Sequence, residues 1–401
     1  MPPTHDRLPG DSSAIMTPGL LVAALFLAAL SLRPQLVGAG PLVPGIQADL
    51  GLSHAVAGLL GTIPVACMGV FAGVAPIVVA RLGSMVAIGA SVALIGIAGL
   101  ARSLAADSPQ IVATTIGIGI GMGIAGALLP VFVKQRLGQR PILGTVAYSA
   151  GLQLGSAASA ALAVPLALAF GGWRAAFAVF SIATLALVVP WLLLGRDRSG
   201  ETQARVAIDR QDVLDQRAWV LATVFALFGV VYYGLVAWLA DAYVELGWSP
   251  TEAGGLLGLL NVASLTGALS IGLFAGRMVS HTTTLAVLGA IFAVATTGFA
   301  VLPAAGPAFA ILAGYANGAL FPLVLALPLR LVGSADRVAW LTSVMLGLGY
   351  TIAAISPVGL GAIRDVVGSF HASLLVLAVA SVVFAVGVTI VGRWPTSENP
   401  A

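Results

Sequence analysis

Residues 20–42 have the sequence LLVAALFLAALSLRPQLVGAGPL, and this stretch predicts a helix that crosses a membrane. At ~1.5 Å per residue it is long enough for a hydrocarbon core of ~30 Å. Arg33 is its one charged residue and lies about 20 Å along the helix. A charge at such a depth costs about 2.5–3.5 kcal/mol on insertion scales, so an arginine kept there is a candidate for function.

The rest of the chain has the same character. Hydrophobic residues make up 59% of its 401 residues and charged residues 8%, whereas a soluble domain carries about 25% charged residues. The apolar runs are continuous rather than alternating, which favours helices over the strands of a barrel. We predict an all-α membrane protein with twelve spans, at residues 20–42, 55–79, 84–104, 110–133, 141–168, 174–195, 218–244, 252–277, 283–303, 308–331, 338–362 and 371–392.

The positive charges predict the orientation of these spans. With the N-terminus in the cytoplasm, fourteen of the 18 lysines and arginines fall on the cytoplasmic side. Three, Arg102, Arg174 and Arg364, fall outside, and Arg33 lies within a span. Cytoplasmic loops are enriched in lysine and arginine. We therefore expect a multi-pass protein of the inner or plasma membrane with both termini in the cytoplasm.

Two halves of the sequence are similar to each other. Asp49–Ser53 and Glu245–Ser249 are similar segments 196 residues apart, and Gly126–Pro130 and Gly318–Pro322 are similar segments 192 residues apart. Parallel repeats with a substrate path between them are typical of alternating access. We predict an N-terminal tail at 1–18, a six-helix bundle at 19–195, a cytoplasmic linker at 196–217, a second six-helix bundle at 218–392 and a cytoplasmic tail at 393–401.

The motifs also resemble those of a known family. Leu32–Pro34, Gly126–Lys134, Gly171–Arg174 and Gly318–Pro322 are similar to segments of the cyanate permease and 2-nitroimidazole transporter family. This family is a branch of the major facilitator superfamily, and the resemblance covers nearly the whole chain. It implies the major facilitator fold of two pseudo-symmetric six-helix halves, a transporter rather than an enzyme, and a monomer.

Two loops depart from the superfamily pattern Gly-x-x-x-Asp-Arg-x-Gly. The loop after the second span has Ala80 before Arg81, and the loop after the eighth has Gly276 before Arg277. Both therefore lack the aspartate of the usual charge relay. Through the resemblance, Arg81 and Arg277 remain candidates for gating.

Asp241, near the outer end of span seven, is a further candidate for gating or coupling. It could line the entrance, act as a counter-ion to Arg33, or be solvated, and we favour a solvated or structural role. Protons remain a candidate coupling ion, although no histidine or carboxylate maps to mid-membrane as a relay. The histidines map to loops or span ends: His5, His54, His281 and His371.

Arg33 is the first candidate for binding a substrate, because a guanidinium suits a carboxylate or another small anion. The alternative is that it binds carbonyls freed by a kink at Pro34. Tyr232 and Tyr233 are adjacent, ~100° apart on a helix, so we expect one of them to face a cavity. The full set of further candidate lining residues is Gln35, Tyr148, Gln153, Tyr232, Tyr233, Trp238, Asn261, Tyr315, Asn317 and Tyr350. For each, the alternative is an interhelical hydrogen bond.

These observations predict a secondary active transporter that moves a small anionic or polar solute, cyanate-like or a related organic compound, by alternating access. The first alternative is an exporter of small aromatic compounds or drugs such as nitroimidazoles. A membrane-embedded enzyme or a receptor is disfavoured, because the sequence has no catalytic triad, metal-ligand cluster, nucleotide motif or large loop domain. We expect no cofactor, metal or nucleic-acid partner, only the solute and membrane lipid.

Overall fold

The computed structural model describes residues 18–137, 141–193, 215–274 and 280–395. All regular structure in these ranges is helical, which confirms the predicted all-α class. Twelve helical stretches are long and apolar enough to cross a membrane, as predicted. They are Gly19–Leu50, His54–Phe71, Ser84–Ser103, Ser108–Val133, Gly144–Phe170, Trp173–Leu192, Gln216–Glu245, Pro250–Leu273, His281–Val301, Pro303–Leu325, Arg337–Val367 and Phe370–Gly392.

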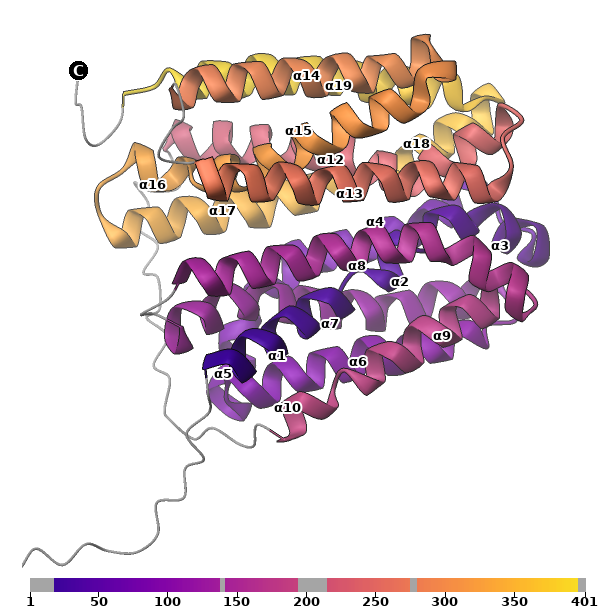
Figure 1. Cartoon of the computed structure of the whole chain (residues 1–401), viewed down its shortest axis with the longest axis horizontal. Coiled ribbons are helices and arrows are strands. Elements are labelled where there is room, and N and C mark those ends of the chain that lie inside the picture. The colour runs from indigo at the N-terminus through magenta and orange to yellow at the C-terminus, as the bar shows by residue number, and fades with distance from the viewer. Residues whose placement is uncertain (1–17, 138–140, 194–214, 275–279, 396–401) are drawn as a thin grey trace, which may run out of the picture.

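The first group of helices packs together as one layer (Figure 1). Within it α8 lies against α1, and α7 lies against both α4 and α6. Its elements are α1 (Pro18–Ser31), α2 (Pro34–Val37), η1 (Gly40–Leu42), α3 (Val43–Leu50), α4 (His54–Ala72), α5 (Ala75–Leu82), α6 (Ser84–Ser103), α7 (Ser108–Arg136), α8 (Pro141–Phe170), α9 (Trp173–Ala186) and α10 (Val189–Leu193).

The second group forms the other layer. Its elements are α12 (Gln216–Glu245), α13 (Pro250–Phe274), α14 (His281–Val301), η3 (Pro303–Ala305), α15 (Gly306–Leu325), α16 (Leu327–Leu331), α17 (Ala335–Ala353), α18 (Ile355–Val367) and α19 (Phe370–Gly392). The two groups meet where α8 lies against α13 and where α4 lies against α17 and α18. The predicted tail 1–18, linker 196–217 and tail 393–401 fall almost wholly outside the described residues, so the predicted domain boundaries stay predictions.

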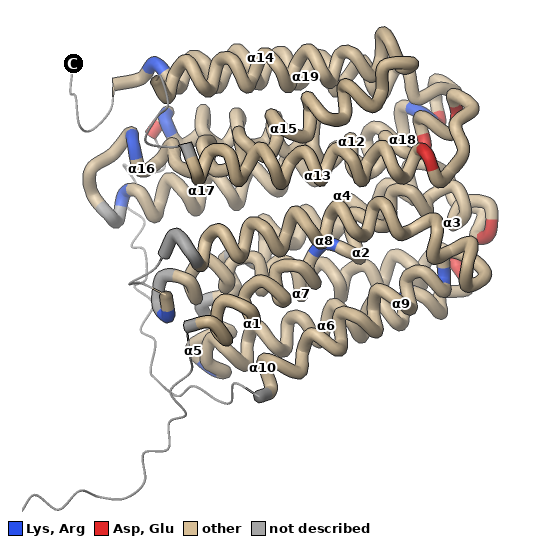
Figure 2. The backbone as a smooth tube through the Cα atoms, viewed as in Figure 1, with Lys and Arg blue, Asp and Glu red and all other residues tan. Residues whose placement is uncertain are grey.

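Charge divides the molecule into two ends (Figure 2). We call the end where α1 begins and α19 finishes the terminal end, and the opposite end, where α3 finishes and α9 begins, the distal end. Among the described residues, most lysines and arginines gather at the terminal end and most acidic residues gather at the distal end. Between the two ends the helices are nearly free of charge, as a hydrocarbon solvent requires.

The first span is interrupted instead of being the single helix predicted at 20–42. Its first helix, α1, ends at Ser31, and α2 begins at Pro34. Proline has no N–H and its ring clashes with the carbonyl four residues earlier, so a helix breaks in front of it. Pro41 and Pro44 interrupt the chain again around η1, and the span continues to Leu50. The first break leaves Arg33 as the residue that caps the start of α2.

Close packing of α15 on α13 depends on a missing side chain. A Cβ at Gly318 would lie 1.7 Å from the backbone oxygen of Ser264, which is far too close for two non-bonded atoms. A glycine here allows the two backbones to touch, as small residues do between membrane helices. The contact fixes α15, which carries Asn317, against α13.

We expect Gly318→Ala to lower the melting temperature of the purified protein, with a loss of about 1–3 kcal/mol of stability from overpacking. Gly126→Ala in α7 is the matched control, because a Cβ there meets no atom within 4 Å. Thermal melting in detergent compares the two variants with the wild type. An unchanged melting temperature for Gly318→Ala would contradict the packing described above.

Candidate functional site

A cavity of about 400 Å³ lies between the two groups of helices. Its wall includes Arg33 and residues of α8, α12, α13, α15 and α17. Val146, near the start of α8, and Leu273, at the end of α13, line it and are exposed. Both belong to the terminal end, so the cavity opens towards that end. Its volume is within the range of sites for small organic ligands, about 300–1,000 Å³.

Arg33 brings an unpaired positive charge to this cavity. The side chain is 7% exposed, and its Nε and Nη1 atoms have no hydrogen-bond partner among the described residues. Tyr232 and Tyr233 lie within electrostatic reach of the guanidinium, as does Tyr350. None of the carboxylates in the part of the chain that the structure describes lines the cavity. The Tyr233 hydroxyl lies within hydrogen-bond reach of the guanidinium, so Arg33 has a polar neighbour but no counter-ion among the described residues, and burial of such a charge is costly.

A hydrogen-bond acceptor faces the same cavity. Asn317 donates its Nδ2–H to Ser264 Oγ at 3.1 Å, while its Oδ1 atom has no partner among the described residues. Gln153 also donates to Ser264 Oγ, and this bond joins α8 to α13 across the two groups. Ser264 therefore fixes both amides on the wall. Arg33 and Asn317 therefore both line the cavity, and each has buried polar atoms without a partner among the described residues.

Aromatic rings form much of the remaining wall. Tyr232 and Tyr233 both line the cavity, with ring centroids 5.1 Å apart, so the expectation that one of them would face it is wrong. The residues of α12 that line the cavity recur at helical spacing, as a stripe of Phe225, Phe228, Gly229, Tyr232 and Tyr233. Such a stripe is at least about 100° wide and can include neighbours in sequence.

Three further residues of the predicted set do not line the cavity, and two of them, Asn261 and Tyr315, form hydrogen bonds between helices instead. Asn261 is buried, donates to Leu257 O at 2.8 Å and accepts from the Tyr232 hydroxyl at 3.2 Å. Tyr315 is turned outward and shares a 3.0 Å hydrogen bond with Ser270. Tyr148 packs against the core within electrostatic reach of Arg33, but it does not line the cavity. From the predicted set, the cavity wall contains Arg33, Gln153, Tyr232, Tyr233, Asn317 and Tyr350.

Gln35 belongs to a buried cluster that sequence analysis missed. Arg102, expected on the outer side, has no exposed surface. Its Nη2 donates to the backbone oxygen of Gln35 at 2.7 Å and to Oε1 at 2.5 Å, and its guanidinium lies 3.9 Å from the centre of the Phe177 ring. Gln35 in turn donates to Ser181 at 2.9 Å. The cluster ties the segment after Arg33 to α6 and α9, and the only sequence signal for it is an arginine inside the last turn of a span.

The two gating candidates that the structure describes, Asp241 and Arg81, lie away from the cavity. Asp241 is 8% exposed at the distal end, so neither the solvated position nor the pairing with Arg33 applies. Trp238 is buried beside it and donates to Pro357 O at 2.7 Å rather than lining the cavity. Arg81 is exposed in the last turn of α5 at the terminal end. Arg277 lies outside the described residues.

The sequence-family model of the Major Facilitator Superfamily matches residues 19–354 of this chain. The chain belongs to this superfamily. It is 29% identical to the 2-nitroimidazole transporter of Escherichia coli (strain K12), over 93% of this chain and 95% of that protein. It is also 29% identical to the cyanate transport protein CynX of the same strain, over 87% and 91% of the two chains. The predicted resemblance is therefore confirmed, and the protein is a transporter rather than an enzyme.

A solved structure has the same fold. It is a bacterial homologue of the human lysosomal transporter Spinster in an inward-facing and occupied conformation. The TM-score is 0.72 at 16% sequence identity, with 94% of this chain and 97% of that chain covered. The predicted arrangement of twelve membrane helices in the major facilitator fold is confirmed.

The two buried arginines should differ in their effect on stability without a ligand. We expect Arg102→Gln to lower the melting temperature, because it removes charged hydrogen bonds worth about 1.5–3 kcal/mol. Arg33→Gln should melt at or above the wild-type temperature, because it removes a buried charge without a partner. Thermal melting of both variants in detergent checks the contrast. An equal loss in both would mean that Arg33 holds the fold together.

Proposed function

We propose that the protein carries a small organic anion with a flat, apolar body by alternating access, and that Arg33 binds the anionic group. One observation carries the proposal: a buried guanidinium without a counter-ion among the described residues lines a mostly apolar cavity whose wall includes six aromatic side chains. A planar guanidinium donates two parallel hydrogen bonds to a carboxylate or a similar anion. The rings of Tyr232, Phe228 and Phe321 would pack against the apolar body.

Size favours such a solute over cyanate itself. Cyanate has three heavy atoms and would leave most of a cavity of about 400 Å³ to water. An aromatic carboxylate would occupy far more of it. Its ring would contact the aromatic wall, and a polar substituent could donate to the free Oδ1 of Asn317. Filling the cavity with an apolar body gains affinity by removing apolar surface from water.

The charge distribution supports an orientation with the terminal end in the cytoplasm of the cell that makes the protein. Most lysines and arginines lie at that end (Figure 2), and cytoplasmic loops are the ones enriched in these residues. In this orientation, in the inner or plasma membrane, the cavity opens to the cytoplasm and the distal end faces outward. Rocking of the two groups would expose the cavity to the outside. We propose a monomer as the transporting unit, with Arg81 and Arg277 assigned to gating.

A neutral nitroaromatic solute is the second candidate. It is favoured by the tyrosine hydroxyls and phenylalanine rings, which would bind a ring without any charge. In that case Arg33 would contact a nitro group or water, and transport would be export. The two candidates differ in one measurable property, which is how strongly binding at Arg33 depends on a negative charge on the ligand.

A matched pair of ligands tests this difference on the purified protein. Benzoate and benzamide have the same ring and nearly the same size, but only benzoate is charged. We expect benzoate to raise the melting temperature with concentration, since stabilisation follows RT ln(1 + [L]/Kd). Arg33→Gln should lower the affinity for benzoate at least about tenfold, the loss of roughly 1.4 kcal/mol, and leave benzamide unchanged. Arg393→Gln is the control, because Arg393 is exposed and lies outside the cavity wall.

Cyanate, benzoate and 2-nitroimidazole belong in the same experiment. If 2-nitroimidazole stabilises the wild type and Arg33→Gln equally while no anion stabilises either, the anion carrier is refuted and the nitroaromatic candidate takes its place. Counterflow of the best ligand in proteoliposomes then tests whether binding leads to transport.

A further inference from the structure

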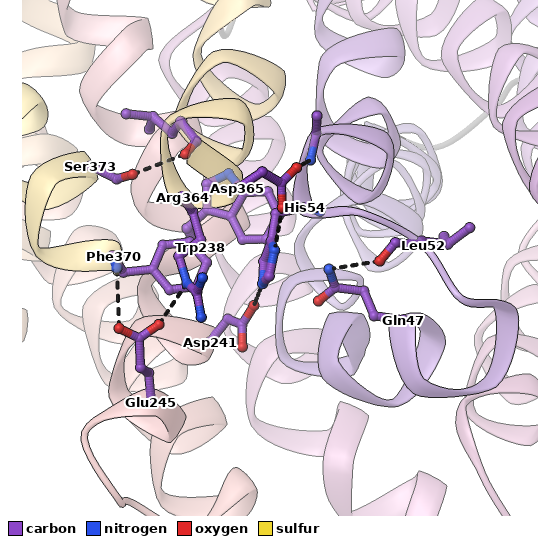
Figure 3. A network of polar contacts seen from close by, with 12 residues as sticks. Gln47, Leu52, His54, Trp238, Asp241, Glu245, Arg364, Asp365, Phe370 and Ser373 are labelled. Atoms are coloured by element: carbon purple, nitrogen blue, oxygen red, sulfur yellow. Dashed lines mark hydrogen bonds and ion pairs between the residues drawn. The ribbon is translucent and has the colours of Figure 1, made fainter. Parts of the chain in front are cut away.

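His54 inserts its side chain into the opposite group of helices at the distal end (Figure 3). It stands in the first turn of α4, where its Nδ1 lies 2.7 Å from Asp365 Oδ1 of α18. Its Nε2 lies 3.9 Å from Asp241 Oδ2 of α12. The imidazole is therefore held between two carboxylates, and both belong to the second group while His54 belongs to the first. We call these three residues the distal clamp.

Two aromatic rings complete the surroundings of the imidazole. Its ring centroid lies 5.8 Å from that of Trp238 and 5.4 Å from that of Phe370. Aromatic faces attract a cation through their quadrupole. Carboxylates and aromatic rings on the facing helices therefore enclose the imidazole of His54.

The backbone of α4 joins the same contact. Asp365 accepts the N–H of His54 at 3.0 Å and the N–H of Ala55 at 2.8 Å. These are free donors at a helix N-terminus, where the helix dipole favours a negative charge. One carboxylate of the second group therefore binds both the side chain and the first turn of a helix from the first group. The clamp exists only while the distal end is closed.

Packing confirms that the two groups touch closely here. A Cβ at Gly58, one turn further along α4, would lie 2.5 Å from Pro357 O of α18. Thr62 accepts the N–H of Val358 at 3.1 Å one turn beyond. The distal contact is therefore a continuous seam along α4 and α18, and the clamp lies at its outer edge.

The number of N–H groups on the imidazole decides how many carboxylates of the clamp it can contact as a donor. A neutral imidazole has one N–H and can donate to one carboxylate, whereas an imidazolium has two. With one N–H directed at Asp365, a neutral ring presents a lone pair to Asp241. Asp241 is 8% exposed, and its Oδ2 atom has no hydrogen-bond partner among the described residues. A proton on Nε2 would place a positive charge 3.9 Å from this buried oxygen, within ion-pair distance.

The neighbouring charges are already engaged in other contacts. Arg364 Nε donates to Glu245 at 2.8 Å, and Glu245 also accepts the N–H of Phe370 at 3.2 Å. Arg364 also acts on Asp241 from within electrostatic reach. On the other elements at this end, Asp49 of α3 pairs with Arg174, Asp107 caps α7, and His371 lies exposed on α19.

We propose that His54 is a proton-binding site and that its proton holds the distal end of the transporter closed. The proposal rests on the alternating access proposed above. The contacts of an imidazolium with Asp241 and Asp365 exist only in the closed state, so the closed state binds the proton more tightly. By linkage, the closed population rises as the pH falls and declines as the pH rises. Closing of the outward face would then take up a proton from the outside, which provides a route for coupling to a proton gradient.

Spin-label distances across the distal end test the proposal without any substrate. Leu104 and Leu302 end α6 and α14 at this end and are 76% and 55% exposed. Labels on Leu104→Cys and Leu302→Cys, in a Cys67→Ala background, report separation of the two groups by double electron–electron resonance. As the pH rises from roughly 5 to 8, the range in which histidine changes charge, we expect the ratio of closed to open populations to fall at least about fivefold. One proton site permits at most about tenfold per pH unit.

Variants identify the titrating group. His54→Gln should abolish the pH dependence and favour the open distance, while His371→Gln, an exposed histidine at the same end, should behave as the wild type. Asp241→Asn should reduce the pH dependence and provides a second variant if His54→Gln does not fold. A wild-type distance that does not change with pH, or a pH dependence that survives in His54→Gln, overturns the proposal. Neither result depends on which solute binds at Arg33, so failure of the anion site and failure of the clamp are separable.

Discussion

A guanidinium kept inside a membrane protein needs something to replace its water, and this requirement organises the structure. Arg33 stands where Pro34 breaks the first span, so its backbone leaves the helix and its side chain reaches the space between the two groups. The fold gives it tyrosine hydroxyls but, within the described residues, no carboxylate in the cavity. Partial solvation of this kind leaves room for a mobile anion, whereas an ion pair with the protein would have occupied the site permanently.

The precision of that placement comes from a second buried cation. Arg102 holds the backbone and the side chain of Gln35, two residues beyond Arg33, and stacks on Phe177. A broken helix would otherwise have several orientations available, because the carbonyls at the break no longer accept hydrogen bonds from the N–H groups of a following turn. Arg102 thus stabilises the break in the first span, and the break places Arg33 at the cavity. These different roles explain why the two arginines, neither of which has a carboxylate partner among the described residues, differ in their surroundings.

The fold could be predicted from the sequence much better than the site could. Twelve continuous apolar runs fix the number of spans, because length and hydropathy are properties of each segment alone. Which side a residue faces depends on neighbours from distant segments: Asn261 and Tyr315 have the chemistry of lining residues but bond between helices. Arg102 was predicted on the outer side, and a solvated position was one of the roles weighed for Asp241, because both lie near span ends, yet both are buried. His54 appeared to be a loop residue, and only the approach of α18 and α12 gives it partners.

The cavity and the distal clamp lie at different depths along one axis, and their chemistry is complementary. An anion bound at Arg33 neutralises the charge that the two groups share around the cavity, and a proton at His54 neutralises part of the excess of carboxylates at the distal end. A ligand shifts a conformational equilibrium only by its difference in affinity between the states. The proton has a different affinity for the two states by geometry, since both carboxylates beside His54 belong to the other group of helices. The anion acquires it if closing of the distal end brings Asn317 and Arg33 onto the same solute, because the two residues come from different groups.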